Sequence, residues 1–202
     1  MPKVTYDNIE FDSVGEMHFY WWCEELQEAG CIESFETQPT PILLSYPEVL
    51  EYTIPMKRVA DKTKQHNILN GHFYTYDSII VWNEDAERLF CFNLTNYAKS
   101  GFNKKVDSKK LISQQCVCRI ELKPKFDQNN MTRLAIVNQK WTYEKTGKFI
   151  NIVIPEKLFE KTFTPKRYLL TDVSKTKRKI KFKTRSLEEF VKINTTEQLS
   201  LI

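Results

Sequence analysis

The sequence predicts an α/β (α+β) fold, with a central mixed sheet flanked by helices and a basic C-terminal extension. The 202 residues are 41% hydrophobic and 28% charged, a composition typical of a soluble domain that buries roughly 70% of its unfolded surface. β-Branched and aromatic runs bounded by turn residues indicate strands. Between residues 116 and 154, the order strand, helix, strand indicates a crossover unit, which requires parallel pairing. We divide the chain into a domain at 1–160 and an extension at 161–202, packed on the domain or appended to it.

The first long element is predicted to be a helix from Ser13 to Gly30. Ser13 and Glu16 have the spacing of a capping box, and a glycine commonly ends a helix. Strands are expected to follow at 32–38 and 41–46, because prolines interrupt an otherwise strand-like run.

The middle of the chain contains two expected insertions. Residues 47–70 predict a loop or a hairpin, and the polar, Lys-rich residues 95–113 predict a loop with a short helical piece. Between them, the Asn70-Gly71 turn signal introduces the clearest strand, at 72–82. A turn and a second strand at 88–94 are expected next.

The crossover unit combines a strand at 116–123, a helix at about 129–145 and a strand at 149–154, and a short helix is expected at 156–162. The helix is predicted to bury an apolar face formed by Leu134, Ile136, Val137 and Trp141. On the same helix Gln139 and Tyr143 are four residues apart and therefore point the same way.

The C-terminal part is strongly basic. Residues 161–185 contain ten Lys or Arg residues and one acid, so the rest of the chain is net negative within a total of +4. Such a run is often only a solvated surface, but like charges without neutralising acids favour phosphate binding. The candidate nucleic-acid-binding residues are Lys175, Lys177, Arg178, Lys179, Lys181, Lys183 and Arg185. The alternation around Ile180 and Phe182 predicts a strand with one basic face, and a capping box at Ser186 predicts a closing helix at 186–191.

Composition excludes several classes of function. With five glycines the chain has no Gly-rich phosphate loop. Five cysteines without a Cys-x-x-Cys pair, and three histidines, make a zinc site or a disulfide framework unlikely to form and favour a reducing, cytoplasmic compartment. No long apolar run or signal peptide is present, so we expect neither secretion nor a membrane span.

Three acids and one lysine are candidates for chemistry, and each has a structural alternative. Glu121 and Lys123 share one face of their strand, where an ion pair is the simpler explanation when they are taken alone. Asp77 interrupts a strand, and either lies on an exposed face or is held by a cation. Glu16 either caps its helix, which its local sequence favours, or points at a neighbouring site. Asp107-Ser108-Lys109 repeats the acid-x-Lys spacing inside a polar segment.

In this order, these elements resemble the PD-(D/E)XK nuclease superfamily over about residues 9–154. The resemblance rests on Glu16 in the first helix, Asp77, the Glu121-Leu122-Lys123 triplet and a RecB-type Gln-x-x-x-Tyr element at Gln139 and Tyr143. Residues 32–44, with Gln38-Pro39, are similar to small phage-encoded members. Two features depart from the family pattern: Tyr76 stands where proline often precedes the aspartate, and the long spacing from Asp77 to Glu121 requires the insertion at 95–113.

The resemblance implies a restriction-endonuclease-like core and divalent-metal-assisted cleavage of DNA. Asp77, Glu121 and the backbone carbonyl of Leu122 would hold Mg²⁺ or Mn²⁺, and Glu16 would orient a second ion or a water. Lys123 would position the attacking water and stabilise charge on the phosphate. Gln139 and Tyr143 would steady the metal cluster or the DNA backbone.

The sequence therefore predicts a Mg²⁺- or Mn²⁺-dependent deoxyribonuclease that processes phage or prophage DNA and acts in the cytoplasm, that of the host if the chain is phage-encoded. Endonuclease, exonuclease and junction resolvase remain open, and a resolvase would require a homodimer. The alternative is a catalytically silent nucleic-acid-binding or interaction protein on the same fold, in which Glu121 and Lys123 form an ion pair.

Overall fold

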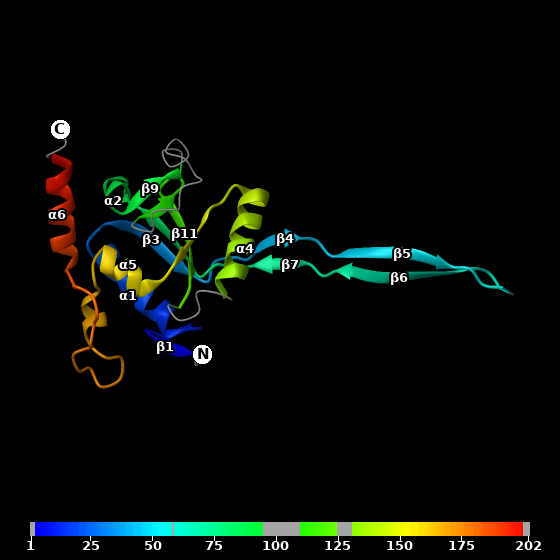
Figure 1. Ribbon diagram of the computed structural model, residues 1–202, viewed down its shortest axis with the longest axis horizontal. Coiled ribbons are helices and arrows are strands. Elements are labelled where there is room, and N and C mark those ends of the chain that lie inside the picture. The colour runs from blue at the N-terminus through cyan, green and yellow to red at the C-terminus, as the bar shows by residue number, and fades with distance from the viewer. Residues whose placement is uncertain (1–2, 58, 95–109, 125–130, 200–202) are drawn as a thin grey trace.

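The computed structural model describes residues 3–57, 59–94, 110–124 and 131–199. Its centre is a four-stranded mixed sheet with the order β12-β11-β8-β3 (Figure 1). These strands are β3 (Ile32–Thr37), β8 (Ser78–Trp82), β11 (Val117–Leu122) and β12 (Ile150–Val153). β8 runs antiparallel to β3 and β11, and β12 runs parallel to β11. The predicted mixed α/β class and the parallel crossover pairing are therefore confirmed.

Helices cover both faces of this sheet. α1 (Val14–Glu28) packs against β3 and α5 (Pro155–Lys161), whereas α4 (Met131–Thr146) packs against β12 and β4. Because side chains alternate along a strand, Cys118, Ile120 and Leu122 face the α1 side. The residues between them belong to the α4 side. The capping box predicted for α1 is formed, since Ser13 is the N-cap and its hydroxyl accepts the Glu16 amide N–H.

An aromatic core fills the α1 side of the sheet. Trp22 is fully buried and stacks on Phe19 and on Phe163, each with a ring-centroid distance of 5.6 Å. Its indole N–H donates to the Thr162 hydroxyl at 3.2 Å. Phe190 of the last helix, α6 (Leu187–Leu199), lies in the same buried cluster. Residues on both sides of position 160 thus contribute to one core.

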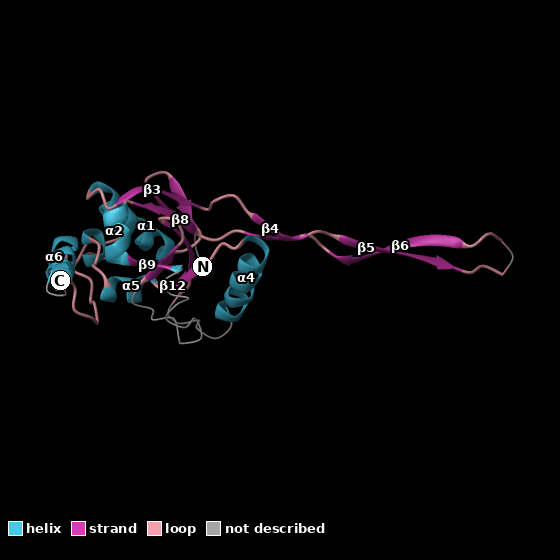
Figure 2. Cartoon of the chain, turned by 90° about the horizontal axis from the view of Figure 1, so that it is seen from above, coloured by secondary structure: helices cyan, strands magenta, loops and turns pink. Residues whose placement is uncertain are grey.

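Four two-stranded sheets surround the centre. They pair β1 (Val4–Tyr6) with β2 (Ile9–Phe11), β4 (Ile42–Ser45) with β7 (His72–Tyr74), β5 (Glu48–Ile54) with β6 (Lys62–Leu69), and β9 (Cys91–Asn93) with β10 (Leu111–Ser113). The insertion predicted at 47–70 is a hairpin, β5–β6, which extends away from the body of the molecule (Figures 1 and 2).

Two predicted strands are wrong in part. The run at 72–82 is broken into β7 and β8, with Asp77 in the break. The strand predicted at 88–94 is helix α2 (Glu84–Phe90) up to Phe90 and only then becomes β9. Three acids in the first turn of α2, and an i,i+4 ion pair between Arg88 and Glu84 at 3.0 Å, favour the helix over the local β propensity.

The loop predicted at 95–113 contains a strand at its end. β10 pairs in parallel with β9, and the side-chain amide of Asn151 bonds both backbone groups of Ile112. Residues 95–109, and with them Asp107-Ser108-Lys109, lie outside the described residues.

The apolar face predicted for the crossover helix is wrong in part: Trp141 packs against a buried cluster, but Leu134 and Val137 do not face inward. Leu134 and Val137 of α4 are 62% and 54% exposed, and the buried positions are Ala135, Asn138 and Thr142. Small and polar side chains face inward here because α4 packs closely over β4 and β12, where Asn138 lies within hydrogen-bond distance of His72 (3.3 Å). Leu134, Ile136 and Val137 are left exposed.

The basic segment near the C-terminus is extended but is not the strand that its alternation predicts. Ile180 and Phe182 do pack against the core while the neighbouring lysines are exposed. Within the described residues, the β-type pairing of this segment is limited to an isolated bridge between Lys177 and Leu170. The closing helix is longer than predicted, and its capping box between Ser186 and Glu189 is formed in both directions. In the described part of the chain, no helix is long and apolar enough to cross a membrane.

We expect Trp22→Ala to lower the free energy of unfolding by about 3–5 kcal/mol, because it removes a fully buried ring that joins α1 to the C-terminal part. Urea unfolding followed by circular dichroism measures the change. Val173→Ala, at a 95% exposed position, is the matched control and should change stability by less than about 0.5 kcal/mol. A small effect at Trp22 would show that the two parts fold independently.

Candidate active site

The antiparallel pairing of β8 with β11 brings the candidate residues together. Ser78 at the start of β8 lies opposite Ile120 near the end of β11. The residue before Ser78 is Asp77, so it meets the Glu121-Leu122-Lys123 triplet. The Asp77 carboxylate (Oδ2) accepts the backbone N–H of Leu122 at 2.5 Å.

Glu121 and Lys123 form an ion pair that is almost fully removed from solvent. Lys123 Nζ lies 2.5 Å from Glu121 Oε1, and the two side chains are 13% and 10% exposed. The predicted shared face is thus confirmed. The simpler explanation for these two residues was an ion pair on an exposed strand, whereas this pair is buried. Burial removes the hydration of both charges, so the pair adds little net stability.

Tyr74 is a site residue that the sequence analysis did not identify. Its hydroxyl donates to Glu121 Oε2 at 2.8 Å, so both carboxylate oxygens of Glu121 are bonded. Burial, and then the charge of Glu121, raise the pKa of Tyr74 and keep the phenol a donor. Tyr74 is on β7 and Glu121 on β11, so their contact joins residues far apart in the sequence. The sequence feature that could have identified Tyr74 is its position three residues before Asp77.

The electrostatics of Asp77 are unusual. Burial, followed by the charge of Glu121, raises its pKa to about 7, while the Leu122 N–H opposes this shift and the charge of Glu16 adds to it. Three carboxylates, on Glu16, Asp77 and Glu121, therefore act on each other next to one ammonium, on Lys123. The site has a deficit of positive charge, which is the condition that a divalent cation relieves.

Glu16 caps its helix, as its local sequence favours, and it also lies close to Asp77. Its carboxylate caps α1, accepting from the Ser13 hydroxyl at 2.8 Å and the Asp12 N–H at 3.1 Å. It also borders, together with Asp77 and Leu122, a small cavity of about 10 Å³. Burial raises the pKa of Glu16 despite the Ser13 hydrogen bond. Among the described residues, no group of three or more His, Cys, Asp or Glu side chains is arranged closely enough to hold a metal ion as they stand.

Gln139 and Tyr143 do not reach this cluster. The Gln139 amide donates to the Ile150 carbonyl at 2.5 Å, where it satisfies a backbone group of the edge strand β12. Tyr143 lies edge-on to Phe149 and is 43% exposed. Both residues are on α4, as predicted, but they contact Ile150 and Phe149 and not the carboxylates of the site.

Beside Lys123 there is a cavity of about 250 Å³ between the N-terminal ends of α1 and α5. It is bordered by His18, whose Nε2 lies 3.0 Å from Asp172 Oδ1. Asp172 also binds the guanidinium of Arg178 at 2.6 Å, and that guanidinium lies over the Tyr168 ring. Arg178, predicted to bind nucleic acid, is therefore engaged inside the protein.

The other predicted nucleic-acid-binding residues lie on the surface. Arg185 is partly buried and donates to the Glu160 carbonyl at 3.3 Å. The exposed members are Lys175, Lys177, Lys179, Lys181 and Lys183.

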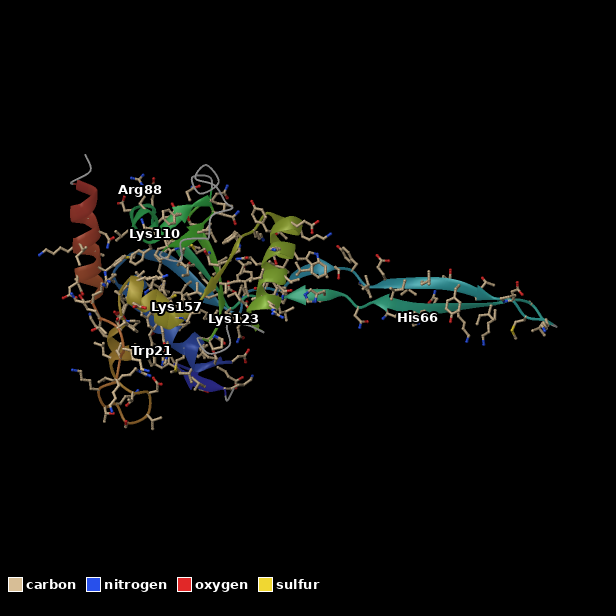
Figure 3. All side chains as sticks on the ribbon, in the orientation of Figure 1. Trp21, His66, Arg88, Lys110, Lys123 and Lys157 are labelled. Carbon is tan, nitrogen blue, oxygen red and sulfur yellow. The ribbon has the colours of Figure 1, made fainter. Side chains whose placement is uncertain are left out.

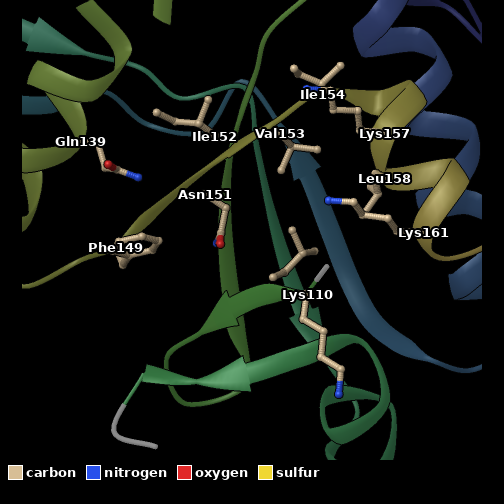
Figure 4. Close-up of a pocket in the computed structure, with 11 residues that line it drawn as sticks. Lys110, Gln139, Phe149, Asn151, Ile152, Val153, Ile154, Lys157, Leu158 and Lys161 are labelled. Atoms are coloured by element: carbon tan, nitrogen blue, oxygen red, sulfur yellow. The ribbon is translucent and has the colours of Figure 1, made fainter. Parts of the chain in front are cut away.

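A second basic surface was not predicted. A cavity of about 260 Å³ lies along β12 and α5, and Lys110, Lys157 and Lys161 border it (Figure 4). Lys157 and Lys161 are four residues apart on α5, so they point to the same side. Ile154 borders both this cavity and the one beside Lys123, so the two are adjacent. Figure 3 shows Lys157 and Lys123 in the same region of the molecule.

No protein-family model, no curated protein sequence and no solved structure was found to match this chain.

In metal-free buffer containing EDTA, we expect Asp77→Asn to be more stable than the wild type at pH 8 by up to about 4 kcal/mol. A folded-state pKa of about 7, against 3.8 for the free side chain, means that the folded protein holds a proton which the unfolded chain releases. Stability therefore falls as the pH rises from about 4 to 7, and the amide removes this loss. The advantage should disappear below pH 4.

Urea unfolding at several pH values measures this difference, with Glu144→Gln on the exposed side of α4 as the matched control. A less stable Asp77→Asn variant at pH 8 would contradict the electrostatic description of the site.

Proposed function

We propose that this chain is a divalent-metal-dependent DNA nuclease with a restriction-endonuclease-like core of the PD-(D/E)XK type. The observation that carries the proposal is the meeting of Asp77 with the Glu121-Leu122-Lys123 triplet at the paired ends of β8 and β11. The element order α1, β3, β8, β11, α4, β12 supports it, since it is the helix, strand meander, crossover helix and strand that the family resemblance implies.

The residues of the site fit a hard divalent cation. Asp77, Glu121 and Glu16 provide carboxylate oxygens, and the Leu122 carbonyl adjoins them; oxygen ligands are those that Mg²⁺ and Mn²⁺ prefer. Asp77 is also buried close to the charges of Glu121 and Glu16, which raise its pKa after the larger effect of burial. When bound, the ion supplies Lewis-acid stabilisation of the phosphate and lowers the pKa of a water.

The remaining roles belong to side chains of the chain itself. Lys123 stabilises charge on the scissile phosphate; a unit charge at about 4 Å contributes about 4 kcal/mol at an effective dielectric constant of about 20. Tyr74 holds Glu121 in place through its hydroxyl, and Glu16 is fixed by the capping box, so neither acid has to be ordered when substrate binds.

DNA would follow the basic surface that leads away from the site. The cavity bordered by Lys110, Lys157 and Lys161 is adjacent to the cavity beside Lys123, so phosphates on either side of the cleaved bond can contact lysines. The exposed lysines between Lys175 and Lys183 provide a second set of phosphate contacts.

One observation favours a catalytically silent nucleic-acid-binding protein as the second candidate. Both carboxylate oxygens of Glu121 are bonded within the protein, to Lys123 and Tyr74. If these contacts persisted in the presence of metal, the pair would be structural and the lysine surfaces alone would account for function.

Replacing Asp77 by Asn, Glu121 by Gln or Lys123 by Met should each reduce Mg²⁺- or Mn²⁺-dependent DNA cleavage by at least about a hundredfold, because each removes part of one charged unit. Double variants should be little worse than single ones. Cleavage is measured on linear duplex, single strand, nicked circle and four-way junction, with Glu144→Gln as the control.

Magnesium should raise the melting temperature of the wild type and not of Asp77→Asn. Undiminished cleavage in all three variants would refute the nuclease, and absent metal binding in the wild type would favour the silent binder.

The lysine cavity makes a separate prediction about binding. The double variant Lys110→Gln, Lys157→Gln should weaken duplex DNA binding and reduce the slope of log affinity against log salt by about 2, because each lysine replaces roughly one counterion. Binding is measured with Ca²⁺ in place of Mg²⁺. Lys145→Gln, at the exposed end of α4, is the control. An unchanged slope would remove this cavity from the DNA-binding surface.

A further inference from the structure

The β5–β6 hairpin, residues 48–69, is an arm whose strands pair with each other and, among the described residues, contribute to no core cluster. It projects well beyond the rest of the molecule in both views (Figures 1 and 2). Every side chain of β5 and β6 is exposed except Ile54, which is partly so. The two strands form their own two-stranded sheet, so each has an open outer edge. A lone two-stranded hairpin is marginally stable in water, and open edges readily pair with other strands.

The arm carries exposed apolar side chains at both of its ends. Val49, Leu50, Ile68 and Leu69, at the end of the hairpin nearest the body, are all more than half exposed. At its tip, Met56 and Val59 are also exposed. Monomeric proteins rarely leave so many large apolar side chains together in water, and such surfaces commonly mark protein interfaces.

A second apolar area lies at the root of the arm. Tyr46 and Phe73, on either side of the arm, are 72% and 64% exposed. The exposed stripe of α4 begins beside them, since Trp141 stacks on His72 with ring centroids 5.2 Å apart, and Val137 is one turn away. Tip and root therefore both carry exposed apolar side chains, at opposite ends of one ribbon.

The charge of the arm argues against nucleic acid as its partner. Residues 48–69 contain four Lys or Arg residues and three acids, so they are almost neutral, in contrast with the lysine surfaces on the body. Phosphate-binding elements require an excess of positive charge, whereas a nearly neutral mixture of both signs is compatible with contact to a second protein surface.

A second copy of this chain fits the geometry. If two arms lie antiparallel about a two-fold axis, the tip of each, which carries Met56 and Val59, reaches the apolar root of the other, and two open edges become paired. Strands of seven and eight residues span roughly 25 Å, so the overlap is long. The 22 residues of the arm also correspond to the roughly 20–30 residues per partner of a stable interface.

We propose that the β5–β6 arm pairs with the same arm of a second copy to form a symmetric dimer, with each tip against the partner's root and α4 stripe. This association is independent of the nuclease chemistry. If the proposed function also holds, the two-fold axis relates two catalytic sites, as cleavage of two strands requires.

The experiment is the molar mass of the full chain, measured by light scattering during size-exclusion chromatography and by sedimentation equilibrium. The wild type should have twice the 24.0 kDa chain mass at micromolar concentration. Leu50→Glu combined with Ile68→Lys should give the single-chain mass with an unchanged circular dichroism spectrum of the body, because both side chains are more than half exposed and neither belongs to a core cluster. Val173→Glu, exposed elsewhere, should remain dimeric.

A cysteine placed in the middle of the arm gives a second readout. Tyr52→Cys should form a disulfide between two copies under mild oxidation, whereas Val173→Cys should not. A monomeric wild type at about 100 µM, or an arm variant that stays dimeric, would overturn the proposal. A monomeric wild type whose arm variant loses DNA affinity would instead identify nucleic acid as the occupant.

Discussion

The antiparallel hydrogen bonding between β8 and β11 is the constraint on which the site depends. Antiparallel strands place the beginning of one beside the end of the other, and the observed register sets Ser78 opposite Ile120. Asp77 and the Glu121-Leu122-Lys123 triplet, which are far apart in the chain, become neighbours for this reason alone. A slip of one residue would turn Glu121 and Lys123 to the aromatic core on the α1 side, where their charges would have no partner.

The charges collected there reduce stability. Asp77 keeps a proton close to neutral pH because burial and nearby carboxylates disfavour its ionised form. The Glu121–Lys123 pair is buried as well, and the hydration lost by a buried pair offsets most of its attraction. Strained electrostatics of this kind concentrate at functional sites, whereas the rest of the fold is held by ordinary apolar packing around Trp22.

The C-terminal extension and the hairpin differ in how they join the body. The extension is tied to α1 through Asp172 and Arg178, and its Phe190 enters the main core, so its exposed lysines are held on a fixed surface. In the part of the chain that the structure describes, the hairpin contributes no residue to a core cluster and leaves its apolar side chains in water. The basic segment thus shares the core of the body, whereas the arm is a surface on which the proposed dimer would form.

The sequence by itself determined those features that depend on neighbouring residues. The capping boxes at Ser13 and Ser186, the strand ended by Pro124 and the crossover of 116–154 follow from local spacing and propensity, and they are as predicted. Tertiary structure decided what depends on packing: the outward turn of Leu134 and Val137, the internal use of Gln139 and Arg178, and the contact of Tyr74 with Glu121. The physical reason is that a helix face or a hydroxyl donor has no preferred partner until strands distant in sequence are paired, and that pairing was fixed here by β8 and β11.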